Sequence, residues 1–103
     1  MEKPPIHEGL LLDETVTYTL TELTQFGGLQ EKIIIEMVEY GIVEPEGENQ
    51  EKWIFRSKSI IRFQKAIRLH QDLNINWPGI SLALDLLDEV HELRQLVKTL
   101  QKD

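Results

Sequence analysis

The sequence contains no cysteine, and this absence excludes a whole group of functional sites. Disulfides, thiolate nucleophiles, iron–sulfur clusters and thiolate metal sites all depend on this residue. There is also no apolar run close to the roughly 18 residues that a membrane-spanning helix needs. The first residues, Met-Glu-Lys-Pro-Pro, lack the charged and apolar regions of a signal peptide. We therefore expect a soluble, cytoplasmic protein without a membrane partner.

Positive charge is scarce as well. Eleven Lys and Arg stand against 18 Asp and Glu in 103 residues, which gives a formal net charge of −7. A nucleic-acid-binding surface needs cations to contact phosphates, so this balance argues against nucleic acid as the partner. Hydrophobic residues make up 41% of the chain, which is too many for a disordered chain and enough for the core of one domain.

The excess acid lies entirely in the first half of the chain. Residues 1–52 hold three Lys and twelve acids, a net charge of −9, whereas residues 53–103 hold eight Lys and Arg and six acids, a net charge of +2. Such an asymmetry often marks an interaction surface, and the alternative is a solvated face that only keeps the protein soluble. The helix positions of these acids, described below, favour the interaction surface.

The local patterns of the first half predict two short helices followed by a β-hairpin. Alternating residues predict a strand over 16–20, and Thr19 or Thr21 can cap a helix that Gly27-Gly28 ends. A second helix is expected from about Leu29 to Tyr40. The apolar stretches that follow it are expected to form the two strands of the hairpin around a polar turn, Ile42-Val43 and Trp53–Phe55.

The second half predicts two longer helices. Ser57 is a suitable N-cap for a helix that reaches about Leu73, and another helix is expected from Ile80 to about Gln101. Two short helices and a hairpin form a winged helix-turn-helix. The expected fold is therefore mainly α, with a small hairpin wing and a long C-terminal helix. Its parts are an N-terminal extension at 1–15, the winged helix-turn-helix with the third helix at 16–79, and a helical dimerisation segment at 80–103.

Three stretches make the sequence recognisable. They are EYGIVEP at 39–45, WIF at 53–55 and LHQDLNINWPGISLALDLLD at 69–88. Over about residues 16–100 the chain resembles the MerR-like winged-helix family and, within it, the CbpM branch of chaperone modulators. This resemblance implies a homodimer that binds the J-domain of a CbpA-type co-chaperone. It also implies that binding limits the stimulation of the DnaK chaperone by that co-chaperone.

The second predicted helix carries acids where a DNA-binding winged helix carries cations. At about 100° per residue, one face is apolar and is expected to face the core: Leu29, Ile33, Ile34, Met37, Val38 and Tyr40. The opposite face presents Glu31, Glu36 and Glu39 beside a single cation, Lys32. Carboxylates repel phosphates and release no counterions, so DNA binding through this helix is not expected.

The same face is our candidate site for the J-domain. Ile35 lies between Glu31 and Glu39 without a predicted core partner. An exposed isoleucine is common on a soluble helix, but an apolar contact ringed by carboxylates also suits a basic helix of a partner. Family members bind a J-domain, which presents such a helix to DnaK. We therefore assign the partner-binding residues Glu31, Ile35, Glu36 and Glu39.

The last helix has the spacing of a coiled coil. Apolar residues recur at intervals of three and four, at Ala83, Leu86, Val90, Leu93, Val97 and Leu100. The expected dimer interface consists of Leu86, Val90, Leu93, Val97 and Leu100, in an antiparallel pair of helices. Leu82, Leu87 and Leu96 widen the stripe, so part of it is expected to pack on the body. The alternative is that the whole stripe belongs to the intramolecular core.

No pattern indicates catalysis, a metal site or a cofactor. The histidines are His7, His70 and His91, and His91 has no second ligand at i+4, the spacing of a helical metal-binding pair. His70 falls on the apolar side of its helix and is expected at the edge of the core. We therefore expect a binding protein and not an enzyme. The competing hypotheses are a small MerR-like DNA-binding transcription regulator and an architectural dimer within a larger complex.

Overall fold

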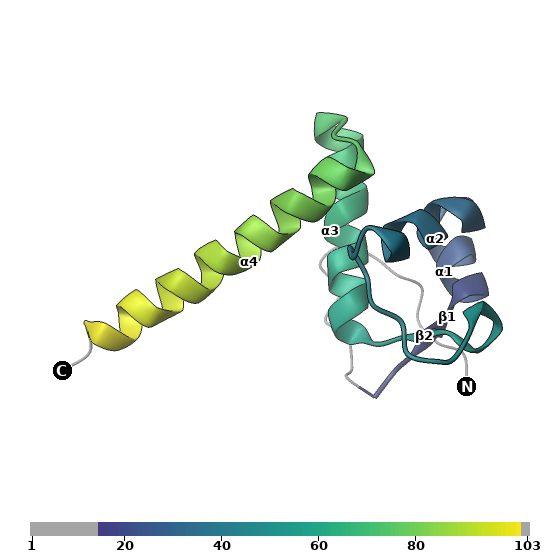
Figure 1. Ribbon diagram of the computed structural model, residues 1–103, viewed down its shortest axis with the longest axis horizontal. Helices are drawn as coiled ribbons and strands as arrows, with labels where there is room; N and C mark the ends of the chain where they lie inside the picture. Colours follow the sequence, from purple (N-terminus) through teal and green to yellow (C-terminus); the bar gives the residue numbers. More distant parts are fainter. Residues whose placement is uncertain (1–14, 102–103) are drawn as a thin grey trace.

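The computed structural model describes residues 15–101. Its elements follow in chain order as β1 (Tyr18–Thr19), α1 (Leu20–Gly27), α2 (Glu31–Glu39), the 3-10 helix η1 (Gln50–Lys52), β2 (Ile54–Phe55), α3 (Ser57–Leu73) and α4 (Trp77–Leu100). The first six elements, from β1 to α3, form one body, and α4 extends away from this body as a rod (Figure 1). The predicted mainly helical fold with a small antiparallel sheet and a long C-terminal helix is confirmed. None of the described helices combines the length and apolar character that crossing a membrane requires.

α1 begins and ends where its sequence signals lie. The Thr19 hydroxyl oxygen accepts from the Glu22 backbone N–H at 3.1 Å, and the Glu22 carboxylate accepts from the Thr19 N–H at 2.9 Å. This reciprocal pair satisfies backbone donors that the first helical turn leaves without partners. At the other end, Gly28 adopts a left-handed φ of 67°, which a glycine reaches without a steric penalty. Of the two predicted caps, Thr19 is therefore the one that is used.

The predicted pairing of the hairpin is wrong. β2 pairs antiparallel with β1, with Tyr18 opposite Phe55 and Thr19 opposite Ile54. Ile42 and Val43 belong to no strand and are both buried. A strand would place successive side chains on opposite faces, whereas this segment crosses the core with both side chains inward. The return of the wing is a single bridge between Glu46 and Ile54.

The core lies between α3 and the elements that surround it. Ile34 and Met37 of α2 and Phe63 of α3 are completely buried. The other buried residues come from β1, α1, β2, α3, α4 and the segment after α2: Tyr18, Leu20, Leu23, Ile42, Val43, Phe55, Ile60, Ala66, Ile80 and Leu84. Tyr40, which we expected on the core face, is 46% exposed because α2 ends at Glu39 and the chain turns away.

The turn between α3 and α4 is fixed by polar and aromatic contacts. Asn74 adopts a left-handed φ of 53°, and the Asn76 side chain caps α4 by accepting from the Gly79 N–H at 2.9 Å. The rings of His70 and Trp77 stack with centroids 4.3 Å apart. α4 therefore starts at Trp77, three residues before the predicted start at Ile80. The placement of His70 at the edge of the core is confirmed, since it is half-buried.

Candidate partner-binding surfaces

The acidic face of α2 (Glu31, Ile35, Glu36 and Glu39) lies at the surface of the body. Glu31 and Glu39 are exposed and Glu36 is half-buried. Among the described residues, no cation pairs with any of these three carboxylates. Their charges are therefore available to a partner.

The positions of these acids along α2 differ in what they do for the helix. Glu31 is in the first turn, where a negative charge stabilises the N-terminal end of the helix dipole. Glu36 and Glu39 lie toward the C-terminal end, where no basic residue is present and a negative charge is unfavourable. Acids that oppose the helix dipole give no local stability, and binding to a partner would explain them.

Ile35 differs from the prediction. It is half-buried and packs against the core cluster, so the expectation that it lacks a core partner is wrong. The physical reason is the run of three isoleucines, Ile33 to Ile35, which spreads apolar surface over much of the circumference of a nine-residue helix. α2 therefore lies deeper in the body than a one-sided helix would. The exposed part of Ile35 remains beside the carboxylates.

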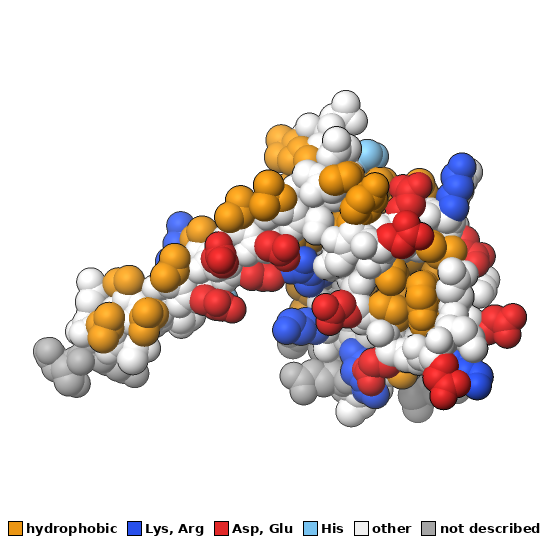
Figure 2. All heavy atoms as spheres, in the orientation of Figure 1, with side chains coloured by type: hydrophobic (Ala, Val, Ile, Leu, Met, Phe, Trp, Pro, Cys, Tyr) orange, Lys and Arg blue, Asp and Glu red, His pale blue; other side chains and the backbone are white. Residues whose placement is uncertain are grey.

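The acidic face continues from α2 onto the wing. Glu31 and Glu51 of η1 line the same surface pocket of about 330 Å³, together with Thr19, Thr21 and Gln50. No sequence pattern places Glu51 beside Glu31, because the folding of the wing brings these two residues together. Figure 2 shows Asp and Glu side chains spread over the body around a patch of apolar atoms.

α4 carries a second unpartnered surface, the apolar stripe (Leu82, Leu86, Val90, Leu93, Val97 and Leu100). The five predicted interface residues among them are between 41% and 75% exposed. The three leucines that widen the stripe, Leu82, Leu87 and Leu96, are exposed as well, so they are not the part of the helix that packs on the body. The residues of α4 that do pack there are Ile80 and Leu84. Figure 2 shows apolar side chains in a row along α4.

The direction of the stripe decides what can cover it. At about 100° per residue, its six members fall within an arc of about 80°. Ile80, Ser81, Leu84 and Asp88, which face the body, are centred about 180° from it. The body of the same chain therefore cannot cover the stripe. Large apolar surfaces of this kind mark sites of association.

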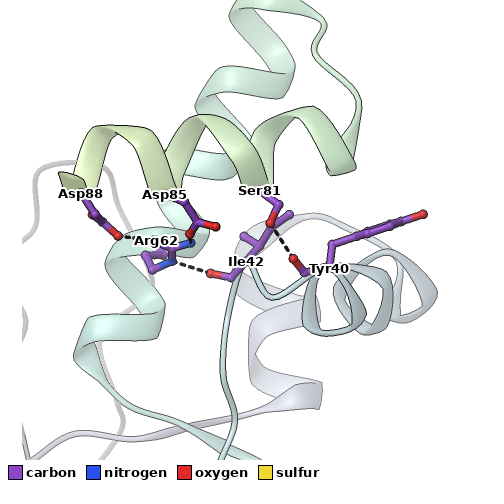
Figure 3. A network of polar contacts seen from close by, with 6 residues as sticks. All are labelled: Tyr40, Ile42, Arg62, Ser81, Asp85 and Asp88. Atoms are coloured by element: carbon purple, nitrogen blue, oxygen red, sulfur yellow. Dashed lines mark hydrogen bonds and ion pairs between the residues drawn. The ribbon is translucent and has the colours of Figure 1, made fainter. Parts of the chain in front are cut away.

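Arg62 of α3 links the segment that follows α2 to the body-facing side of α4, as Figure 3 shows. Its Nε donates to the Ile42 carbonyl oxygen at 2.7 Å, and its two terminal nitrogens lie 2.5 Å from Asp88 and 3.3 Å from Asp85 of α4. Nearby, the Ser81 hydroxyl donates to the Tyr40 carbonyl oxygen at 2.6 Å. The sequence places Arg62 with Lys65 and Arg68 in a group of cations that is ordinary for a solvated helix face, yet the side chain of Arg62 is only 17% exposed.

The geometry offers binding surfaces and little that could hold a small molecule or an ion. Within residues 15–101, no three His, Asp or Glu side chains lie close enough together to hold a metal ion. The pocket beside Arg62 has a volume of about 260 Å³, and three of the five charged residues that line it, Arg62, Asp85 and Asp88, are already engaged with one another. His70 and His91 lie on different helices, and His7 is outside the described residues.

Comparisons with known proteins agree with this geometry. The model of the MerR HTH family of regulatory proteins matches residues 18–102. A chaperone modulatory protein CbpM of Coxiella burnetii is 39% identical over 97 residues, which cover 94% of this chain and 92% of the relative. Proteins of the same name from Escherichia coli and Pseudomonas entomophila are 40% identical over 81 residues and 48% identical over 61 residues. These alignments cover 79% and 59% of this chain, and 80% and 60% of the relatives.

Proposed function

Since the chain belongs to the CbpM family of chaperone modulatory proteins, with a MerR-like fold, we propose that it modulates a chaperone by binding a J-domain. The partner is a co-chaperone of the CbpA type in the cytoplasm. Binding limits the stimulation of DnaK by that co-chaperone. The chain performs no catalysis in this account, and it acts by occupying a surface.

The observation that carries this proposal is the acidic face of α2. Its three carboxylates have no cationic partner among the described residues, and two of them oppose the helix dipole. A J-domain presents a basic helix to DnaK. Opposite charges steer two such surfaces together and fix their register. Competition for the basic helix then explains how binding would restrain the co-chaperone.

DNA binding is the second candidate function, and the family model for regulatory helix-turn-helix proteins is the observation that favours it. In such proteins the second helix enters the major groove and contacts bases and phosphates. Here the corresponding helix, α2, carries Glu31, Glu36 and Glu39 against one Lys32. The charges of this helix favour a basic protein surface over DNA.

We further propose that the chain forms a homodimer through α4. The apolar stripe points away from the body, and none of residues 15–101 of its own chain covers it. In an antiparallel pair, the small Ala83 lies opposite Leu100, and Val90 lies opposite Leu93. Such a pair covers both stripes at once with the same contacts, as a two-fold interface requires.

Calorimetric titration tests the proposed function. We expect an isolated CbpA-type J-domain to bind the full chain with a saturable heat that weakens as salt is raised, because exposed charge pairs are screened. A duplex DNA titrated under the same conditions is expected to give no saturable heat. Binding to DNA that weakens steeply as salt is raised, together with no heat from the J-domain, would instead show that the protein is a DNA-binding regulator.

A further inference from the structure

Within the part of the chain that the structure describes, α4 packs on the body along its first three turns. Ile80 and Leu84 are its buried residues, and every residue from Asp85 to Gln101 is exposed. The α3–α4 turn and the packing of apolar side chains limit the angle between the two helices, but packing of this kind leaves a scatter of about 15–20°. Directional polar contacts between α4 and the body narrow this range further.

Arg62 makes the outermost of these contacts along α4. Ser81 lies near the start of the helix and donates to the Tyr40 carbonyl oxygen. Asp88 lies two turns farther along, and the twelve residues of α4 beyond it are all exposed and extend for about 18 Å. A small rotation of α4 at Asp88 is therefore amplified at Leu100.

The same side chain also holds the segment that follows α2. Nε of Arg62 donates to the carbonyl oxygen of Ile42, whose side chain is completely buried. Tyr40, two residues before it, is held through its own carbonyl oxygen by Ser81. The end of α2 and the exposed part of α4 are therefore connected through one guanidinium and one hydroxyl (Figure 3).

We propose that Arg62 is a positioning residue that fixes the direction of α4 relative to α2. In the proposed dimer, a fixed direction of α4 sets one separation between the two acidic faces. This consequence rests on the proposed function. The positioning itself is a property of one chain. A guanidinium suits this role because its planar fork directs three donors at once, to Ile42, Asp85 and Asp88. A lysine ammonium cannot hold these three acceptors in one fixed geometry.

Distances between spin labels test this inference. The chain has no cysteine, so nitroxides can be attached at Lys32→Cys on α2 and Gln95→Cys on α4 without other changes. Labelled chains are diluted with an excess of unlabelled chains, and double electron–electron resonance measures the distance within one chain. We expect a narrow distribution for native Arg62 and a distribution at least about twofold broader for Arg62→Gln, since the outermost contact of a long rod is lost.

Two further variants make the experiment decisive. The double variant Asp85→Ala, Asp88→Ala removes both acceptors of Arg62 on α4. Both residues are exposed and alanine favours a helix, so the core is not disturbed. We expect the distance distribution to broaden as it does for Arg62→Gln. Arg68→Gln removes an exposed arginine of the same helix and is expected to leave the width unchanged. A native width in both link variants, with a native circular dichroism spectrum, would overturn the role of Arg62. Because both labels are on one chain, this result does not depend on the J-domain or on dimerisation.

Discussion

Val97→Asp is expected to convert the proposed dimer into a monomer. Val97 is half exposed in the single chain and has no contact with the core, so the substitution leaves the fold of the body intact. In an antiparallel pair it places one carboxylate from each chain in the apolar interface. If each costs about 2 kcal/mol on burial, the dissociation constant of the dimer rises about a thousandfold.

Sedimentation velocity at several protein concentrations measures this effect. The control is Gln95→Asp, which adds the same carboxylate to an exposed position of α4 outside the apolar stripe. Gln95→Asp lowers helix propensity more than Val97→Asp does, so a dimer that is lost only in Val97→Asp reports the interface and not the helix. A Val97→Asp protein that still sediments as a dimer would exclude the stripe as the dimer interface.

Glu31→Lys with Glu39→Lys is expected to abolish binding of the J-domain. The double variant replaces two exposed carboxylates of α2 by ammonium groups, which would meet a basic helix with like charge. If each lost charge pair is worth about 1.5 kcal/mol, the affinity falls at least about 100-fold. Calorimetry against the isolated J-domain measures the loss.

The fold of this double variant is expected to remain native. A lysine at position 31 opposes the dipole at the N-terminal end of α2, while a lysine at position 39 favours it at the C-terminal end, so the two effects offset each other. Asp72→Lys with Glu92→Lys is the matched control, because it makes the same change of charge on exposed residues of α3 and α4. An affinity equal to that of the native chain would remove α2 from the binding site.

Local features of this fold could be predicted from the sequence because their causes are local. The Thr19 cap and the Glu22 that completes it are three residues apart, and Gly28 ends α1 one residue beyond it. The length of α4 follows from an unbroken helical pattern after Pro78, which is tolerated in a first turn. The acids of α2 were also placed correctly at the surface, since their angular positions depend only on helical geometry.

The features that the sequence did not predict depend on contacts between distant segments. The partner of Ile54 in the sheet is Thr19, which is 35 residues away and shows no local sign of the pairing. Arg62 has the spacing of a surface residue on α3, and only the passage of α4 with Asp85 and Asp88 buries it. Ile35 was expected to lack a core partner, because the pattern of one helix does not show how deeply that helix lies in the body or which residues surround it.

The most direct test of the account is the mapping of the bound surface on an isotope-labelled J-domain by nuclear magnetic resonance. The unlabelled full chain is added, and the shifts of the J-domain amide signals are followed. If the acidic face of α2 binds the J-domain, we expect the largest shifts in the basic helix that faces DnaK. We also expect these shifts to disappear with the Glu31→Lys, Glu39→Lys variant. Shifts confined to other parts of the J-domain, or shifts that persist with this variant, would contradict it.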